Sequence, residues 1–335
     1  MLAGPTPRLR SSLAPHYSGV RDSRAVSGDS KTAFLLPGQG SQKVGMAAKL
    51  RETDADLVDG YLKRADEASG LDVSQFVDEG PMEMLTRTDV AQPALFSISM
   101  AVVEVARERG LRADFVAGHS LGEYTAAAVS GALDVDDALP LVCERGRLMA
   151  AIQSERPGAM AAIIGLGREQ VEELCSRASE AGLVAPANIN SESQIVASGE
   201  EGGIEKLIEL AEEAGAKRAL RLQVGAAFHS ELMKPVQEKL AARMEGLTWR
   251  DPETPLVANC SGEVVTTGDG VREALITQIA SPVLWVDCVR TLRQAGVNTF
   301  VELGPGRVLT GLVRQIDPEA ELVNADSREA LAPTA

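Results

Sequence analysis

Residues 113–130 read ADFVAGHSLGEYTAAAVS, a short apolar run followed by a glycine-flanked serine and an alanine-rich segment. The run predicts a buried strand and the alanines predict a helix through about Ser130. Gly-x-Ser-x-Gly between a strand and a helix is typical of a nucleophile elbow, a sharp turn that lifts a serine hydroxyl clear of the sheet. Free N–H groups at the helix start can also stabilise a developing oxyanion. We therefore predict that Ser120 is a nucleophile, although the same pentapeptide also occurs in ordinary turns.

A serine hydroxyl needs a base within hydrogen-bond reach, and histidine is the usual one. The chain has three histidines. His16 lies in an N-terminal segment whose composition, with arginines among Ser, Pro and Gly, differs from that of the rest of the chain. His119 is adjacent to the serine, where the turn would direct its side chain elsewhere. His229 remains as the candidate base, although a lone histidine is often only a hydrogen-bonded polar residue of the interior.

From Thr32 onward, short apolar runs alternate with helical patterns, which is typical of an α/β fold with a mostly parallel sheet. The first run, 33–36, leads into the glycine-rich segment 37–42. Such a turn can hold phosphates, but a dinucleotide fingerprint needs a third glycine where this chain has Lys43. A tight turn whose glycines allow close packing is the simpler interpretation.

Residues 158–222 form a pattern of their own. Strands are predicted over 160–164, 184–190, 194–198 and 217–222, and helices over 167–181 and around 204–211. The resulting order, β-α-β-β-α-β, is that of a ferredoxin-like domain. We expect this small domain to be inserted between the serine and the histidine, with a ligand cleft between the two domains.

Composition narrows the class of protein. The chain has 335 residues, a formal net charge of −15 and only 3% aromatic residues, which argues against a nucleic-acid partner. No uninterrupted apolar stretch reaches the ~18 residues of a membrane span. The four cysteines are far apart, which favours buried free thiols over disulfides or zinc. The arginine- and serine-rich residues 1–30 predict a disordered extension, with an organellar transit peptide as the alternative.

Six separated motifs resemble those of the malonyl-CoA:acyl carrier protein transacylases. The resemblance covers roughly 33–316 and implies a hydrolase-like α/β domain with a ferredoxin-like insertion. On this basis we expect a large domain from 31–157 and 223–320, a small domain over 158–222 and a flexible tail over 321–335. The matching motifs are Gly38-Gln39-Gly40-Ser41-Gln42, Gly118-His119-Ser120-Leu121-Gly122-Glu123, Arg145-Gly146, Asn188-Ile189-Asn190-Ser191, Phe228-His229-Ser230 and Gly304-Pro305-Gly306.

The resemblance also implies a role for individual residues. Ser120 would be acylated and His229 would be its base, forming a dyad in place of a triad. A backbone carbonyl from segment 281–285, with Leu284 as the expected residue, would orient the histidine. The backbone N–H groups of Gln39 and Leu121 would form the oxyanion hole. Arg145 would bind the free carboxylate of the substrate, because a guanidinium matches a carboxylate bidentately; an exposed arginine paired with Glu144 is the alternative.

Further expectations concern the pocket and the partners. Phe228 before the histidine is similar to malonyl-selective members, and His119 and Asn188 are expected to line the pocket. The resemblance implies malonyl-CoA and acyl carrier protein as partners, no metal or other cofactor, no membrane, and a cytoplasmic monomer in fatty acid synthesis. Two alternatives stay open: a serine thioesterase or hydrolase, and a polyketide acyltransferase that acts in trans on another short acyl-CoA. A basic patch for the acidic carrier is expected at Lys217, Arg218, Arg221, Lys234, Lys239 and Arg243.

Overall fold

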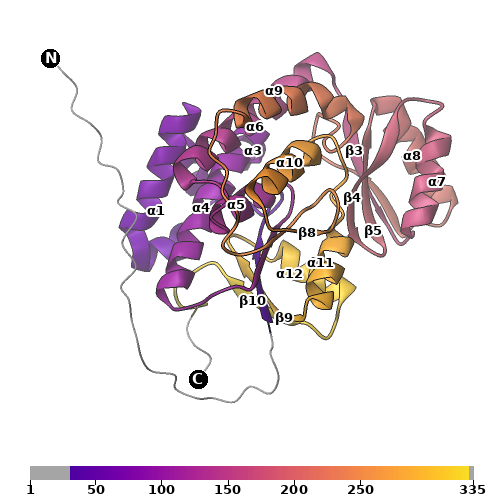
Figure 1. Cartoon of the computed structure of the whole chain (residues 1–335). Coiled ribbons are helices and arrows are strands. Elements are labelled where there is room, and N and C mark those ends of the chain that lie inside the picture. The colour runs from indigo at the N-terminus through magenta and orange to yellow at the C-terminus, as the bar shows by residue number, and fades with distance from the viewer. Residues whose placement is uncertain (1–30, 332–335) are drawn as a thin grey trace.

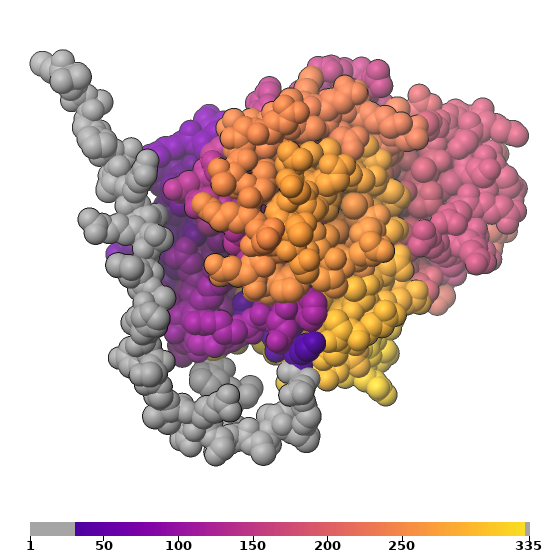
Figure 2. Space-filling model, in the orientation of Figure 1, coloured from indigo at the N-terminus to yellow at the C-terminus, as the bar shows by residue number. Residues whose placement is uncertain are grey.

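The computed structural model describes residues 31–331 of the chain. Its strands form two separate sheets, one of six strands and one of four. Figure 1 shows the larger sheet inside the body of the molecule and the smaller one at the side, covered by its own two helices. In the space-filling view the small sheet and its helices form a lobe beside the larger body (Figure 2). An α/β fold is therefore confirmed, and the smaller sheet belongs to a second unit.

The large sheet is parallel except at one edge. Its order is β10-β9-β1-β2-β7-β8, and within this sheet, among the described residues, only β7 and β8 pair in antiparallel fashion. Because β1 and β2 lie at the centre and are buried, their carboxyl ends hold the loops after them firmly in place. The strands are β1 (Lys31–Leu36), β2 (Phe115–Gly118), β7 (Leu256–Val257), β8 (Val264–Val265), β9 (Val297–Leu303) and β10 (Glu321–Ala325).

Helices surround this sheet. One of them, α4, is long and apolar enough to span a membrane, but 89% of its most apolar window is buried inside the fold, so it serves as the core helix of the large unit. The helices of the large unit are α1 (Ala48–Ser69), α2 (Val73–Asp78), α3 (Met82–Thr86), α4 (Thr88–Glu108), α5 (Leu121–Val129), α6 (Val135–Glu155), η1 (Glu231–Met233), α9 (Lys234–Met244), α10 (Gly268–Gln278), α11 (Trp285–Gln294) and α12 (Val308–Ile316).

The small unit has the predicted β-α-β-β-α-β order. Its sheet is antiparallel, in the order β4-β5-β3-β6, and its apolar residues form a core of their own with α7 and α8. The elements are β3 (Ala159–Ile164), α7 (Arg168–Ala178), β4 (Val184–Ser191), β5 (Gln194–Gly199), α8 (Glu201–Glu213) and β6 (Arg218–Arg221).

The expected tail over 321–335 is wrong for most of its length. β10 pairs in parallel with β9, and the carboxylate of Glu302 on β9 accepts hydrogen bonds from Asn324 on β10 and from the N–H groups that begin α12. Beyond β10, Arg328 forms ion pairs with Asp54 and Glu108. The predictions for 1–30 and 332–335 lie outside the described residues.

All four cysteines are free, as predicted. Cys143, Cys175 and Cys288 are buried and Cys260 is half-buried. Burial raises the pKa of the Cys143 and Cys175 thiols to about 12. These side chains therefore act as small apolar groups of the interior.

Candidate active site

Ser120 occupies a strained turn between β2 and α5. Its backbone has φ 53° and ψ −107°, and it is one of two non-glycine residues with positive φ in 31–331. The flanking glycines are required by contact: a Cβ at Gly118 would lie 1.9 Å from the carbonyl of Gly122, and one at Gly122 would lie 2.0 Å from the carbonyl oxygen of Leu36. This crowding holds the unfavourable backbone in place and lifts the serine side chain above the sheet.

The other residue with positive φ is His229, at 59°. The Ser120 hydroxyl lies 2.7 Å from His229 Nε2, and His229 Nδ1 lies 3.0 Å from the backbone carbonyl oxygen of Gln278. Because a carbonyl can only accept, Nδ1 carries the proton and Nε2 is free to accept the serine proton. Backbone strain at both residues of the pair is typical of active sites, where the surrounding fold holds functional residues in unfavourable conformations.

The expectation for Leu284 is wrong. Its carbonyl accepts the N–H of Cys288 in the first turn of α11, and its own N–H donates to Asn259. The carbonyl that orients the histidine belongs to Gln278, the last residue of α10. A carbonyl at a helix C-terminus has no partner within its helix, so it is available to accept the imidazole N–H.

The imidazole is kept neutral. His229 is only 4% exposed, and burial, followed by the positive charge of Arg145, lowers its pKa from 6.5 to about 3. A histidine with such a pKa is a neutral base throughout the physiological range.

Arg145 on α6 is buried, not exposed. It is 1% exposed, and its guanidinium donates to Gln92 at 2.7 Å, to the Gln278 side chain at 3.1 Å and to the Ser120 hydroxyl at 3.2 Å. These partners in the described chain are all neutral. Glu144 pairs instead with the exposed Arg147, so the alternative of a surface ion pair does not apply to Arg145.

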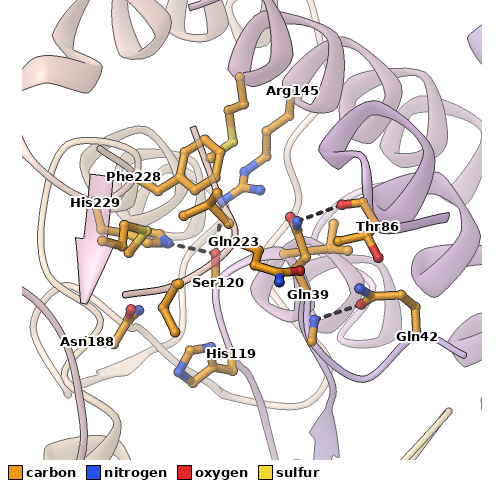
Figure 3. A pocket seen from close by; sticks show the side chains of 16 residues that line it. Gln39, Gln42, Thr86, His119, Ser120, Arg145, Asn188, Gln223, Phe228 and His229 are labelled. Carbon is orange, nitrogen blue, oxygen red and sulfur yellow. Dashed lines mark hydrogen bonds between the residues drawn. The ribbon is translucent and has the colours of Figure 1, made fainter. Parts of the chain in front are cut away.

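A cavity of about 300 Å³ opens at these three groups. In Figure 3, Arg145 reaches toward Ser120 from α6, and His229 approaches the serine from the opposite side. Phe228, predicted for the pocket, is also in the lining. The other lining residues are Gln39, Gly40, Gln42, Thr86, His119, Leu121, Met149, Met160, Asn188, Leu222, Gln223 and Val224.

Gln39 and Leu121, the residues expected to supply the oxyanion-hole N–H groups, both line the cavity with Ser120. Neither N–H has a hydrogen-bond partner within residues 31–331. The loop of Gln39 approaches the elbow very closely, since a Cβ at Gly38 would lie 2.2 Å from the carbonyl oxygen of His119. Two unpaired donors next to a nucleophile can stabilise an oxyanion, so the site can carry out acyl transfer through an acyl-serine.

Comparison with known proteins agrees with this chemistry. Residues 33–334 match the acyl transferase domain family. The chain belongs to this family. It is 42% identical over 303 residues to a malonyl CoA-acyl carrier protein transacylase of Bacillus subtilis, covering 90% of this chain and 95% of the relative. It is 41% identical over 285 residues to the Escherichia coli K12 protein of the same name, covering 85% and 92%.

Solved structures give the same result. A Burkholderia pseudomallei acyl-carrier-protein S-malonyltransferase is 40% identical, with a TM-score of 0.85 and coverage of 90% of this chain and 98% of that one. A malonyl-transacylase in complex with a type II polyketide acyl-carrier protein is 38% identical, with a TM-score of 0.86 and coverage of 90% and 98%.

His119 and Asn188 of this acyl transferase line the cavity, but Figure 3 shows both to one side of the Ser120–His229 pair. His119 Nε2 lies 2.8 Å from Asn190 Oδ1, and burial lowers the pKa of its imidazole. Asn188 sits in β4, where it forms a β-bridge with Val283. Both residues therefore join the small unit to the large one.

Three buried residues behind the serine could not be identified from the sequence. Asn259 accepts the Ser120 N–H at 2.8 Å and donates to the Gly118 carbonyl at 2.7 Å. Gln278 Nε2 donates to the Ser120 carbonyl at 2.8 Å and to Glu123 at 2.5 Å. Burial raises the pKa of Glu123 to about 7. Only the glutamate lies within a recognised motif, and its type alone did not indicate this contact.

Proposed function

We propose that this protein transfers a malonyl group from malonyl-CoA to the phosphopantetheine thiol of an acyl carrier protein. The observation that carries the proposal is the guanidinium of Arg145, which is buried, hydrogen-bonded only to neutral groups in the described chain and 3.2 Å from the Ser120 hydroxyl. A buried cation is costly unless a counter-charge arrives. A short acyl group that ends in a carboxylate supplies that charge while its other end reaches the serine.

The first half-reaction forms a malonyl-serine. Ser120 Oγ attacks the thioester carbonyl carbon, and its proton moves to His229 Nε2. The Gln39 and Leu121 N–H groups stabilise the oxyanion. As the carbonyl re-forms, the carbon–sulfur bond breaks, and the departing CoA sulfur takes the proton from the imidazolium.

The second half-reaction runs in the opposite sense. The carrier thiol gives its proton to His229 as its sulfur attacks the malonyl-serine. When the tetrahedral intermediate collapses, Ser120 leaves with that proton and malonyl-carrier protein is released. The acid–base work is complete with the dyad, so the proposal includes no metal or redox cofactor.

Acyl selectivity has two sources in this proposal. Arg145 selects for the carboxylate, and Phe228, which is 7% exposed, limits the width of the pocket beside it. A single methyl group in such a pocket is worth only ~1–3 kcal/mol, or about 10- to 200-fold. Other short carboxylated acyl groups are therefore disfavoured to a limited degree.

The names of the relatives support this substrate pair and favour a transferase over a serine hydrolase or thioesterase. We also propose that the enzyme is a cytoplasmic monomer that supplies fatty acid synthesis. A polyketide carrier is the second candidate partner, favoured by the solved complex of a similar malonyl-transacylase with a type II polyketide carrier protein.

Intact-protein mass spectrometry after incubation with malonyl-CoA tests the function. The native protein should carry one malonyl group, and Ser120→Ala should carry none. Arg145→Ala should lose most malonyl loading yet keep or improve acetyl loading from acetyl-CoA. Arg147→Ala is the matched control, because this exposed arginine pairs with Glu144, and it should load like the native protein.

Two results would contradict the proposal. Equal malonyl loading by Arg145→Ala and the native protein would remove the carboxylate site. Rapid CoA release without transfer, when carrier protein is present, would identify a hydrolase instead.

A further inference from the structure

Arg145 is connected to the oxyanion loop through buried side chains at the start of α4. The guanidinium donates to Gln92 Oε1 at 2.7 Å, Gln92 Nε2 donates to Thr88 Oγ1 at 2.7 Å, and Thr88 Oγ1 donates to Gln39 Oε1 at 3.0 Å. Gln39 Nε2 in turn donates to the Thr86 carbonyl at 3.3 Å. This chain of hydrogen bonds ends on Gln39, which lines the cavity and whose N–H has no hydrogen-bond partner within residues 31–331.

The direction of the chain is fixed by its first member. A guanidinium can only donate, so Gln92 must turn its oxygen toward Arg145 and its NH₂ toward Thr88. Since the Thr88 hydroxyl accepts from that NH₂, its single proton is directed to Gln39 Oε1. Every donor therefore points away from the cation, and bonds aligned in this way polarise one another.

The chain is enclosed and closely packed. Thr88 is 3% exposed and Gln92 is fully buried. α6 approaches the start of α4 so closely that a Cβ at Gly146 would lie 2.9 Å from the Thr88 carbonyl oxygen. Gly146, next to Arg145, is therefore what allows the guanidinium to reach Gln92.

We propose that Thr88 is a positioning residue that ties the oxyanion loop to Arg145 and so holds the Gln39 N–H in line with the acyl carbonyl. A second connection supports the same arrangement, because Gln278 accepts from Arg145 and donates to the Ser120 carbonyl, in the peptide that bears the Leu121 N–H. Both oxyanion donors are then held in position relative to Arg145, the group that binds the acyl carboxylate. This inference rests on the proposed function.

The test compares Thr88→Val, which removes the hydroxyl at nearly constant shape, with Thr88→Ser, which keeps it. Loss of a whole oxyanion donor costs about 10²–10³ in rate, so a displaced donor should cost about 10-fold. We expect Thr88→Val to lower the serine acylation rate at saturating malonyl-CoA by about that factor, with KM changed less than about 2-fold. Thr88→Ser should recover most of the rate, and the melting temperature of both variants shows whether the fold is intact.

A second substrate separates this inference from the proposed function. The burst of nitrophenolate from p-nitrophenyl acetate needs the serine, the histidine and the oxyanion donors, but neither CoA nor a carboxylate. A smaller burst rate in Thr88→Val, with no malonyl loading even in the native protein, would support the positioning role and contradict malonyl transfer. Malonyl loading of the native protein, together with an unchanged burst rate in Thr88→Val, would support malonyl transfer and contradict the positioning role. If the native protein reacts with neither acyl donor, both are overturned.

Two further outcomes bear on the connection itself. If Thr88→Ser is as slow as Thr88→Val, the methyl group matters and the hydrogen-bond role is overturned. In an Arg145→Ala background, Thr88→Val should cost less than half of its fold-loss in the native background, measured by the ester burst. Equal costs in the two backgrounds would show that Thr88 does not act with Arg145.

Discussion

The charge of Arg145, which we propose binds the carboxylate of the substrate, also acts on His229. Burial lowers the histidine pKa most, and the guanidinium lowers it further, to about 3. The base is therefore unprotonated, and active, at pH values well below the ordinary 6.5. The unfolded chain binds a proton at this position near that ordinary value and the folded one does not, so acid also weakens the folded state as pH falls below it.

We expect the p-nitrophenyl acetate burst rate of the native protein to keep its plateau below pH 6.5. In Arg145→Ala the acid limb should move to higher pH, because one cause of the lowered pKa is gone while burial remains. Arg147→Ala should leave the profile in place. An acid limb in Arg145→Ala that coincides with the native one would contradict the electrostatic account.

The motif predicted Ser120 and elimination among three histidines predicted His229, because each chemical role demands a particular side chain. Arg145 was predicted only through the family resemblance, because an arginine next to Glu144 otherwise suggests an exposed ion pair. The residue that orients the histidine was misassigned because any residue can supply a backbone carbonyl, so Leu284 and Gln278 look equally suitable in the sequence. Asn259 and Gln278 were missed for a related reason. Their amides matter only through neighbours that the fold brings from far along the chain.

At the scale of elements, apolar runs predicted most strands within a few residues. β10 was missed because Glu321–Ala325 is an edge strand with half-exposed side chains, so the sequence lacks the apolar run that marked β1 and β2. The β-α-β-β-α-β order of the small unit could be predicted because its six elements follow one another in one uninterrupted stretch of the sequence.

The elbow between β2 and α5 depends on contact between backbones. Gly122→Ala would place a methyl group 2.0 Å from the Leu36 carbonyl oxygen, and we expect a loss of about 3 kcal/mol in the free energy of unfolding, with acylation abolished. The control is Gly60→Ala in α1, where nothing lies within 4 Å and helix propensity should stabilise the protein by about 0.5–1 kcal/mol. Thermal and urea unfolding measure both, and a Gly122→Ala protein as stable as the native one would contradict the contact.

At the scale of the whole molecule, a chain with a net charge of −15 would need a local positive surface to bind the acidic carrier of the proposed function. Of the six expected residues, Arg221 pairs with Glu201 and Glu205, and Lys234 pairs with Glu231. Lys217 and Arg218 are exposed beside or on β6 and have no carboxylate partner within residues 31–331. The chain runs from β6 directly into Leu222, Gln223 and Val224 of the cavity wall.

Arg218→Glu should therefore raise the KM for phosphopantetheinylated carrier protein by about 2- to 5-fold, the size expected for one exposed charge pair. The ester burst should not change, and the increase should shrink at high salt. Lys63→Glu on α1 makes the same charge change on an exposed side chain outside the small unit and its surroundings. If both variants change the KM equally, net charge and not a docking surface is responsible.

The pairing of β1 with β9 has a consequence for synthesis on the ribosome. The first strand of the large sheet emerges early, but one of its two neighbours is residues 297–303, near the end of the chain. The small sheet, in contrast, consists of residues close in sequence and can close while translation continues. The nascent polypeptide thus carries its nucleophile for 109 residues before its base is made, and the catalytic pair cannot form before that point.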